Sequence, residues 1–476
     1  MAMTPMPPAV QAWASALRTG CMEAQAVTVA AHATGRRADM SIEMVGIIGV
    51  IVVIALMLLR MQVGFAMLLV GFFGTYYLQG WDFTTTVLGL IPFSSAQSYT
   101  MSCLPLFIMM GIVLAESGLG AALFDFASKW LGRVRGSLAM ATAVACGFFA
   151  AICGDSVTTA VTMGKVAFPE MLRYKYSPKL AGAVIACGGT VGILIPPSMC
   201  FIIYGTITEQ SIGKLFLAGF IPGMLQVAFY MVVISVLVRL KKDFAPAVTE
   251  RVSMREKVRS TGQVWPVLVI FLVIMGGMYG GFFTPTEAAA FGAFTSIAVG
   301  FVTRRLRLRN FGNALMESAK NSAMTYFILI GAYVFMRFMT MSNLPVTFGN
   351  AIVGLNADYG VPRLLILLLI LAMYIIFGMF MDVFATILLT LPIVFPVIVQ
   401  LGYDPIWFGV IITRMMEFGM ISPPFGINLF TIAKITRTPI GQLYSGVWPF
   451  LGADVLHIAL LIAVPQLSLW LAGGGA

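Results

Sequence analysis

The sequence predicts an all-α polytopic membrane protein, and three observations support this prediction. Hydrophobic residues make up 59% of the 476 residues and charged residues only 10%, whereas a soluble globular domain carries roughly 25% charged residues. The apolar residues form long runs, such as 44–59 and 264–275, which are typical of membrane-spanning helices. The basic residues gather in short clusters between these runs. A soluble enzyme is therefore excluded, and membrane orientation explains the net charge of +10 better than nucleic-acid binding does.

Residues 1–42 differ from the rest of the chain because they are rich in Ala, Thr and Pro and contain no continuous apolar core. They make a poor signal peptide, which needs such a core before a small-residue cleavage site. We expect this leader to be disordered, or the start to be over-extended, with Met40 or Met44 as equally plausible beginnings.

The remaining chain divides into two halves, 43–240 and 264–476, which a basic linker at 241–263 joins. The expected apolar segments of the first half are 44–59, 63–78, 104–125, 137–171, 180–207 and 213–240. Those of the second half are 264–282, 286–302, 321–341, 345–356, 364–399, 405–434 and 446–472.

Two of these segments, 137–171 and 364–399, are too long for one crossing and carry Gly, Asp, Thr or Pro in the middle. A re-entrant helical hairpin, which enters and leaves the membrane on the same side, accounts for both features. Non-helical backbone at membrane depth persists only where protein or a watery cavity satisfies its polar groups. We therefore predict one re-entrant hairpin in each half.

The orientation follows from the basic residues of the linker at 241–263 and of the loop at 303–309, which holds four arginines. Both stretches should be cytoplasmic, because cytoplasmic loops carry an excess of Lys and Arg. Within the linker, residues 254–263 can form a short interfacial helix whose basic face meets anionic lipid, or a plain solvated connection.

A motif occurs once in each half. Residues 192–198 read Gly-Ile-Leu-Ile-Pro-Pro-Ser and residues 419–425 read Gly-Met-Ile-Ser-Pro-Pro-Phe, so both follow the pattern Gly-x-x-x-Pro-Pro. An intramembrane aspartate, Asp155 or Asp382, lies 37 residues before the glycine of each motif. Two matching motifs at equal spacing indicate an internal duplication.

The paired prolines predict a break in a membrane helix. Proline provides no amide donor and clashes with the preceding turn, and it pushes the residue before it into an extended conformation. The nearby glycine allows a sharp turn. The broken helix exposes carbonyls at one end, which can coordinate Na⁺, and amides at the other, which can hold an anion. Paired broken segments at corresponding positions of two halves are typical of a secondary transporter's binding site.

Each predicted hairpin places hard oxygen ligands upstream of its break, and Asp382 provides a carboxylate in the second half. The side chains that we expect to contact a substrate or ion are Asp155, Ser156, Thr158, Thr159, Thr190, Thr386 and Asn428. In the alternative interpretation both aspartates are helix caps or loop tips that face water, and the paired prolines form simple loops. A carboxylate in mid-membrane is costly without a partner, which favours the functional interpretation.

Several other polar residues have structural alternatives. The stretch 284–287, Thr-Pro-Thr-Glu, reads as a capping box that starts a helix. Glu417 can assist an ion site or pair structurally, while Arg337 and Arg414 can pair with acids or meet an anionic substrate. Asn428 can donate to a substrate or cap the resumed helix. The six cysteines form no CxxC pair, and no nucleophile–base pair or metal cluster appears in the sequence.

These motifs resemble a known family. Residues 188–198, Gly-Gly-Thr-Val-Gly-Ile-Leu-Ile-Pro-Pro-Ser, look like the signature of the large membrane subunit of the tripartite ATP-independent periplasmic (TRAP) transporters. Residues 284–289, 378–382 and 422–430 agree with the same family and stand in its order. The resemblance covers about 44–472, which is nearly the whole chain.

The resemblance implies an elevator-type architecture with inverted repeats, in which two hairpins and two broken helices slide against a scaffold. It also implies Na⁺ coupling through two or more sites at the hairpin tips and broken helices. By motif match the Na⁺ ligands are Gly154, Ser156, Gly192, Ile195, Pro197, Asp382, Gly419, Ser422 and Pro424. The first tip departs from the family, which commonly has Gly-Ser-Ser where this chain has Gly154-Asp155-Ser156.

The resemblance further implies a secondary active transporter subunit, not an enzyme, in the bacterial inner membrane. Its substrate would be a small organic anion: a C4-dicarboxylate, a sugar acid or another carboxylate. Its partners would be a periplasmic substrate-binding protein, a separate small four-helix membrane subunit and the lipid bilayer, without nucleic acid. The competing hypothesis is a stand-alone Na⁺- or H⁺-coupled anion carrier of the same superfamily. A membrane-embedded enzyme or scaffold is a weaker one.

Overall fold

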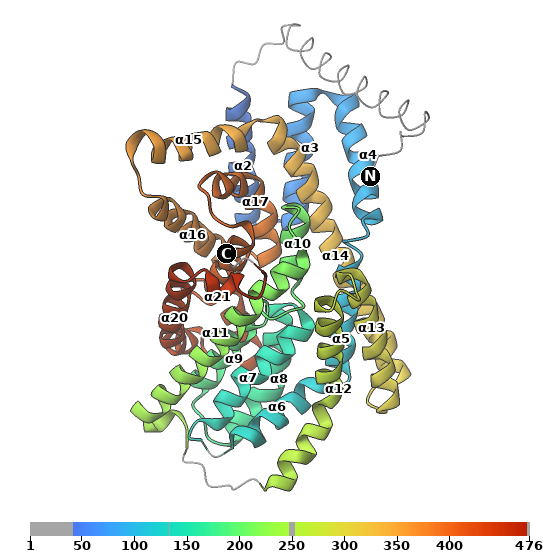
Figure 1. The fold of residues 1–476 in the computed structure, drawn as a ribbon, viewed down its shortest axis with the longest axis vertical. Coiled ribbons are helices and arrows are strands. Elements are labelled where there is room, and N and C mark those ends of the chain that lie inside the picture. The colour runs from blue at the N-terminus through green and yellow to red at the C-terminus, as the bar shows by residue number, and fades with distance from the viewer. Residues whose placement is uncertain (1–40, 133, 247–252, 474–476) are drawn as a thin grey trace, which may run out of the picture.

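The computed structural model describes residues 41–132, 134–246 and 253–473. All but the last two residues of the predicted leader lie outside this part of the chain. Every regular element among the described residues is helical (Figure 1), which confirms the predicted all-α fold. Seven of the described helices are long and apolar enough to cross a membrane, so the chain is a multi-pass membrane protein.

The first half contains ten α-helices among the described residues. They are α2 (Ile42–Leu58), α3 (Val63–Gln79), α4 (Trp81–Gln97), α5 (Cys103–Glu116), α6 (Leu119–Leu131), α7 (Ser137–Cys153), α8 (Ser156–Arg173), α9 (Pro178–Val191), α10 (Met199–Ile207) and α11 (Ile212–Leu240). A short 3₁₀ turn, η1 (Lys242–Phe244), follows α11.

The second half contains another ten. They are α12 (Met254–Tyr279), α13 (Pro285–Val302), α14 (Leu308–Met341), α15 (Leu344–Tyr359), α16 (Arg363–Phe380), α17 (Val383–Gln400), α18 (Pro405–Met420), α19 (Ile427–Thr436), α20 (Ile440–Ala463) and α21 (Gln466–Leu469).

The long segments predicted to be interrupted are each two helices. Segment 137–171 is α7 and α8, which pack against each other across the two residues Gly154 and Asp155. Segment 364–399 is α16 and α17, with Met381 and Asp382 between them. The two segments that contain the paired prolines are likewise divided, into α9 and α10 and into α18 and α19.

Three boundaries differ from the sequence prediction. Helix α4 was not expected, because its threonines and serines lower the hydrophobicity of this segment. The hydroxyl groups of Thr84 and Thr86 donate to backbone carbonyls four residues earlier, at 2.7 and 2.8 Å, so they need no other hydrogen-bond partner. Helix α14 begins 13 residues before the predicted 321, in a polar stretch. Segment 104–125 is not one helix, since α5 and α6 meet at a bend of 67°.

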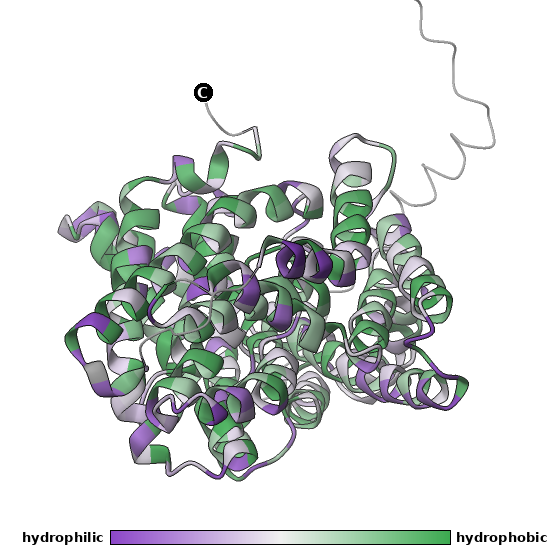
Figure 2. Ribbon diagram, turned by 90° about the horizontal axis from the view of Figure 1, so that it is seen from below, coloured by the Kyte–Doolittle hydropathy of each residue, from purple (hydrophilic) through white to green (hydrophobic). Residues whose placement is uncertain are grey.

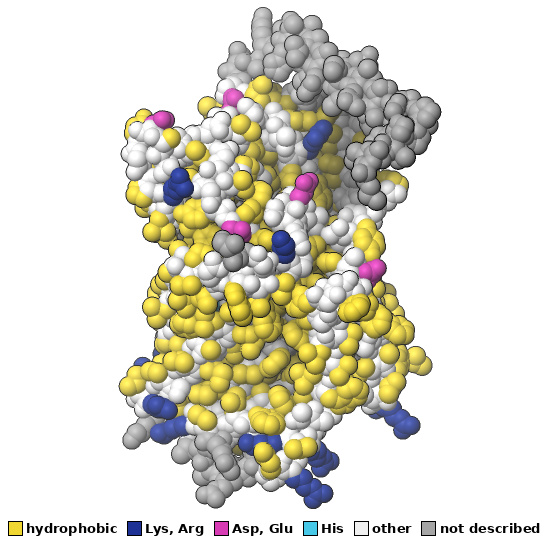
Figure 3. Space-filling view, viewed as in Figure 1, with side chains coloured by type: hydrophobic (Ala, Val, Ile, Leu, Met, Phe, Trp, Pro, Cys, Tyr) yellow, Lys and Arg dark blue, Asp and Glu magenta, His cyan; other side chains and the backbone are white. Residues whose placement is uncertain are grey.

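Charge is distributed unevenly along the long axis of the molecule. Lys and Arg side chains gather at its lower end, below a broad hydrophobic belt (Figure 3). Helix α11 ends, α12 begins and α13 ends at this same end (Figure 1). Hydrophobic residues dominate the helices throughout, with hydrophilic residues in short patches (Figure 2). The described parts of both basic stretches therefore lie at one end, as the predicted cytoplasmic orientation requires.

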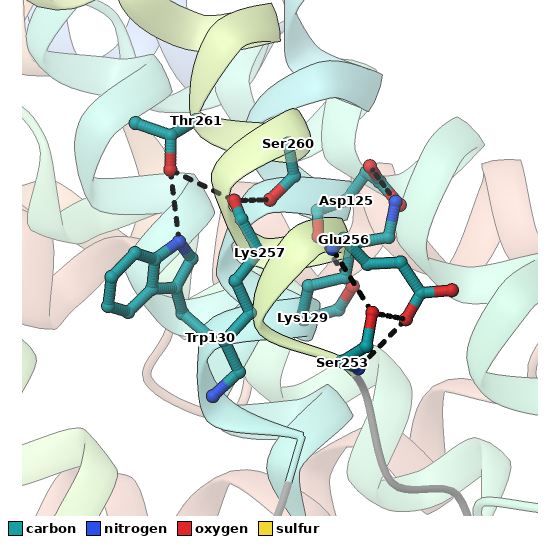
Figure 4. Close-up of polar contacts among 9 residues, drawn as sticks. Asp125, Lys129, Trp130, Ser253, Glu256, Lys257, Ser260 and Thr261 are labelled. Carbon is teal, nitrogen blue, oxygen red and sulfur yellow. Dashed lines mark hydrogen bonds and ion pairs between the residues drawn. The ribbon is translucent and has the colours of Figure 1, made fainter.

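Residues 254–263 form neither a separate interfacial helix nor a plain linker, because they are the first turns of the continuous helix α12. The helix begins at a capping box between Ser253 and Glu256. Figure 4 shows how this end attaches to α6: the indole nitrogen of Trp130 donates to the hydroxyl of Thr261 at 3.2 Å, and the ammonium of Lys257 lies 5.7 Å from the centre of the indole ring.

Small residues allow the helices to approach one another closely. Adding a Cβ to Gly331 of α14 would place it 2.1 Å from the carbonyl oxygen of Gly64 in α3. Such contacts are typical of membrane helices, whose association depends on close packing because lipid is as apolar as the side chains. Helices α7, α8, α9, α19 and α20 pack against one another. Of these, α7, α8 and α9 lie in the lower part of the molecule (Figure 1).

Candidate functional site

The connection between α7 and α8, residues 154–156, is called here the first tip. Gly154 has φ +65°, a left-handed conformation that favours glycine. Asp155 is the N-cap of α8, because its Oδ2 accepts from the amide of Thr158 at 2.7 Å. The hydroxyl of Thr159 donates to the Asp155 carbonyl at 2.8 Å. Asp155 is therefore a helix cap, as the alternative interpretation of the sequence proposed.

The second tip, residues 381–383 between α16 and α17, repeats this arrangement. Asp382 is the N-cap of α17, and its Oδ1 accepts from the amide of Ala385 at 2.7 Å. The hydroxyl of Thr386 donates to the Asp382 carbonyl at 2.9 Å. Cap residue, capped amide and threonine occupy the same relative positions in both tips. The two tips are therefore matched at the level of individual hydrogen bonds.

An electrostatic interaction links the aspartates of the two tips. Asp155 lies close enough to Asp382 for the two carboxylates to interact electrostatically, although 227 residues separate them in the sequence. Both side chains are half-buried. Each aspartate uses one carboxylate oxygen to cap its helix, so the other oxygen of each side chain is available to bind a ligand. Two carboxylates that repel each other in a partly buried space favour a bound cation.

The first break, residues 192–198 between α9 and α10, is wholly buried and includes a cis Pro196–Pro197 bond. A Cβ added to Gly192 would lie 1.7 Å from the Cβ of Ala150 in α7. A Cβ added to Gly154 would lie 3.2 Å from the Pro197 carbonyl oxygen. The break therefore touches the first tip. It also packs so tightly on α7 that only glycine fits at position 192.

The second break, residues 419–426 between α18 and α19, contacts the last turn of α16, directly before the second tip. The rings of Phe380 and Phe425 lie 4.3 Å apart, and a Cβ added to Gly419 would lie 2.8 Å from Gly378. Gly426 has φ +69°, and its Cβ position lies 3.1 Å from the Ser422 carbonyl oxygen. Unlike the first break, this one is partly exposed, since Phe425 is 43% exposed.

Two of the predicted site residues have buried polar atoms without a hydrogen-bond partner among the described residues. They are the hydroxyl of Ser156 at the first tip and both amide atoms of Asn428 in α19. Leaving such groups unpaired costs free energy, so native proteins rarely do so without a function. Helix α19 packs against α8, the helix that Ser156 begins. These unpaired groups indicate a place where a ligand completes the structure.

The remaining predicted residues have more ordinary surroundings. Thr190 is buried in α9 and donates to the Cys187 carbonyl at 2.7 Å. Asn428 does not cap α19, because Gly426 is the N-cap and no side chain bonds there. The hydroxyl of Ser422 donates to the Phe418 carbonyl at 2.6 Å, which leaves its oxygen lone pairs available as acceptors.

Residues that could hold Na⁺ are present at both tips and breaks. The proposed ligands bring hydroxyl, carboxylate and backbone carbonyl oxygens, and unwound backbone carbonyls are the groups that coordinate Na⁺ in discontinuous membrane helices. The buried hydroxyl of Ser156 is available for this purpose. The donor set therefore fits a small hard cation.

Two contacts near the site were not predicted from the sequence. Tyr444 of α20 donates its hydroxyl to the carbonyl of Pro424, and so holds the second break from outside; nothing in the local sequence signals this contact. Arg414 pairs with Asp454 of α20, and both are fully buried. Asp454 could have been found, because it is a lone acid in the apolar segment 446–472.

Two weaker candidates have structural roles. The stretch 284–287 is the predicted capping box, in which the Thr284 amide donates to Glu287 at 2.8 Å and starts α13. The guanidinium of Arg337 lies 6.0 Å from the ring of Phe83, at a shallow pocket of about 440 Å³ between α4 and α14. This pocket shares no residue with the tips or breaks.

Comparison with known proteins adds independent findings. Residues 50–467 match the family model described as "Tripartite ATP-independent periplasmic transporter, DctM component". The chain is 38% identical over 379 residues to the C4-dicarboxylate TRAP transporter large permease protein DctM of Pseudomonas aeruginosa, covering 79% of this chain and 87% of the relative. It is 29% identical over 375 residues to the sialic acid TRAP transporter large permease protein SiaM of Vibrio cholerae, covering 79% and 86%.

A third relative, the isethionate TRAP transporter permease protein DctMQ of Oleidesulfovibrio alaskensis, is 32% identical over 384 residues, covering 80% of this chain and 60% of the relative. Among solved structures, the Alcanivorax borkumensis YdaH transporter superposes with a TM-score of 0.56 at 16% identity, covering 83% of this chain and 89% of that one. At this identity the likeness concerns the fold alone.

Proposed function

The chain belongs to the DctM family of TRAP transporter large permease subunits, and from this premise we propose that it imports a small organic anion by Na⁺ symport. The relatives are named for C4-dicarboxylate, sialic acid and isethionate transport. All three substrates are organic anions. The proposed substrate class is therefore a carboxylate or a related anion.

The observation that supports this proposal best is the matched pair of tips: the first contacts its break at Gly154, and the second follows the turn of α16 that contacts its own break. We propose that each helix pair, α7 with α8 and α16 with α17, is a re-entrant hairpin, and that Na⁺ binds where each tip meets its break. Na⁺ near Asp155 and Asp382 would offset the repulsion between their carboxylates. The cation would therefore assemble the two halves of the site.

The anionic substrate would bind beside these cations. Helix α19 begins at Gly426 without a side-chain cap. The amide of Leu429 donates to the Gly426 carbonyl, so the amides of Ile427 and Asn428 are the ones available to an anion. The unpaired amide of Asn428 lies in this same first turn and can donate to a carboxylate. Na⁺ would contribute positive charge to the substrate site, which couples the two binding events.

Transport would proceed by an elevator movement. The close packing of Gly192 on Ala150 and of Gly419 on Gly378 leaves no room for these segments to slide past each other. Each tip should therefore move together with its break. We propose that these units slide as one body against a scaffold that includes α3 and α14. A periplasmic binding protein would deliver the substrate, and a small four-helix membrane subunit would support the scaffold in the bacterial inner membrane.

The proposal is tested by reconstituting the large and small subunits in proteoliposomes and supplying the substrate-loaded binding protein. Uptake should require an inward Na⁺ gradient and should stop when K⁺ replaces Na⁺. Uptake that ignores Na⁺ would reject the symport mechanism. Uptake of free substrate without the binding protein would favour the stand-alone carrier instead.

A further inference from the structure

Two lysines from different helices meet one aromatic ring near the end of α11. The ammonium of Lys179, in the first turn of α9, lies 5.9 Å from the centre of the Phe244 ring. The ammonium of Lys241, the C-cap of α11, lies 5.4 Å from the same centre. An aromatic face attracts a cation, but two cations at one ring repel each other. An anion bound to both lysines would offset this repulsion.

Backbone hydrogen bonds fix this ring between α9 and α11. The amide of Phe244 donates to the carbonyl of Lys241 at 3.1 Å, and its carbonyl accepts from the amide of Ser177, the N-cap of α9, at 3.1 Å. The aliphatic stem of Lys179 packs against α20, since a Cβ added to Gly446 would lie 3.1 Å from its Cγ. The two lysines are therefore brought together by the fold and do not merely share an open surface.

The described residues leave this positive charge without a counter-charge. Their ion pairs include neither Lys179 nor Lys241. Asp243, in the same 3₁₀ turn as Phe244, is exposed and forms no ion pair with the described residues. Arg239, in the last turn of α11, adds a further exposed cation. The local charge therefore favours a negatively charged ligand.

An apolar stripe of α11 leads directly to this patch. Val232, Val236 and Leu240 are all exposed, and their four-residue spacing places them on one face of the helix. Helix α11 is long and apolar enough to cross a membrane. It ends at the lower end of the molecule, where Lys and Arg gather below the hydrophobic belt (Figures 1 and 3). The patch therefore offers charge to a headgroup and hydrophobic surface to an acyl chain.

We propose that Lys179 and Lys241 bind the phosphate of an anionic phospholipid, whose acyl chain lies along the exposed stripe of α11. Basic residues beside a membrane-spanning helix attract anionic lipid, and the stripe favours a lipid over a soluble anion. The bound headgroup bridges α11 and the start of α9, the helix that leads into the first break. The site does not depend on the proposed Na⁺ symport.

The test measures lipid retention by the full-length protein. Lys179→Gln/Lys241→Gln removes both ammonium groups. Arg255→Gln/Arg259→Gln is the matched control, because it removes the same charge from exposed side chains of α12, which begins at the same end of the molecule. Each protein is reconstituted in vesicles of phosphatidylcholine and phosphatidylglycerol and extracted in mild detergent. Native mass spectrometry then counts the phosphatidylglycerol that stays bound.

Each basic residue near an anionic lipid strengthens binding about fivefold, so the double lysine variant should bind phosphatidylglycerol about 25-fold more weakly than the wild type. The control should retain as much as the wild type. Phosphatidylglycerol should also raise the melting temperature of wild type and control more than that of the variant, because a ligand of the folded state stabilises it. Equal losses in variant and control would assign the binding to general surface charge and overturn the inference.

Two further measurements sharpen the assignment. Phe244→Leu keeps both lysines but removes the ring between them, so retention should fall by a smaller factor; unchanged retention would contradict a site organised by this ring. Inorganic phosphate, added in excess to the wild type, should not displace phosphatidylglycerol. Displacement would assign the two lysines to a soluble anion and overturn the lipid site. None of these outcomes depends on whether uptake requires Na⁺.

Discussion

The two halves of the candidate site share their hydrogen bonds but differ in exposure. Both tips are capped by an aspartate and braced by a threonine four residues later. The first break is wholly buried between α9 and α10, whereas Phe425 of the second break is 43% exposed and Tyr444 holds that break from outside. The same motif is thus built once as a closed site and once as an open one. The first break is therefore enclosed by protein, whereas the second break reaches the surface of the described chain.

The largest effect is expected from the second tip. Asp382→Ala should reduce Na⁺-dependent uptake to background, because it removes both a cap and a proposed cation ligand. Losing even a residue that only supports a metal ligand lowers metal affinity or activity about 10- to 100-fold. The cap alone is worth roughly 0.5–2 kcal/mol, so Asp382→Ser, which keeps a cap, should lose uptake almost as completely. Uptake by reconstituted complexes, normalised to assembled protein, measures this.

Asp404→Ala is the control for Asp382→Ala. Asp404 caps α18 by accepting from the amides of Ile406 and Trp407 at 2.8 and 2.9 Å, and it is exposed and belongs to neither tip. Its replacement should cost stability but leave Na⁺-dependent uptake per assembled complex unchanged. Wild-type uptake by Asp382→Ala would reject the ligand role of Asp382.

Substituting alanine for one glycine in each break, Gly192 or Gly426, compares the packing of the buried first break with that of the partly exposed second break. At Gly192 the added Cβ would overlap Ala150 at 1.7 Å, whereas at Gly426 it meets a carbonyl at 3.1 Å with φ +69°. Overpacking costs about 1–3 kcal/mol, occasionally more, and left-handed strain about 1–2 kcal/mol. We expect Gly192→Ala to lower the melting temperature in detergent more than Gly426→Ala does.

Gly452→Ala is the control for both substitutions, because nothing lies within 4 Å of the added Cβ in α20. In an exposed part of a helix it should be neutral or stabilising by up to about 1 kcal/mol. Equal melting temperatures for Gly192→Ala and Gly452→Ala would mean that the first break is not tightly packed against α7.

Asn428 and Ser156 offer a comparison of the proposed ligands. Asn428→Leu should raise the substrate KM about tenfold, as expected when roughly 1.4 kcal/mol of hydrogen bonding is lost. Ser156→Ala should instead raise the half-saturating Na⁺ concentration. Neither should lower the melting temperature much, because both replace buried polar atoms that have no partner among the described residues. Marked destabilisation with unchanged kinetics would assign these side chains to packing.

The smallest effect is expected at the first tip. Asp155→Ser should still transport, because serine caps helices about as well as aspartate and restores the tip sequence that the family commonly shows. Comparing uptake by Asp155→Ser with uptake by Asp382→Ser shows how much the carboxylate charge contributes at each tip. If Asp155→Ser abolished uptake, the additional carboxylate would be essential in this chain, and the tips would be more alike than proposed.

The tips and breaks could be predicted because their causes are local. Paired prolines and adjacent glycines interrupt a helix wherever they occur, and the equal spacing from Asp155 and Asp382 predicts a repeat. The partner of Arg414 could not be predicted in the same way. Asp454 lies 40 residues further along the chain, and only the packing of α18 against α20 brings the two together.

Helix α4 escaped prediction for another reason. Its threonines return their hydroxyl groups to the helix backbone, so that its residue composition overstates its polarity. The exposure of the second break was equally hidden, because residues 192–198 and 419–425 follow the same pattern. Sequence identified the two motifs, and tertiary packing distinguished them.

Each of the two matched tip-and-break units is proposed to bind Na⁺ during transport. This is tested by measuring the Na⁺-to-substrate coupling ratio in proteoliposomes, from the membrane potential at which opposing Na⁺ and substrate gradients give no net flux. With both sites occupied, two or more Na⁺ should be transported per organic anion. A ratio of one, or a flux that does not depend on the Na⁺ gradient, would contradict it.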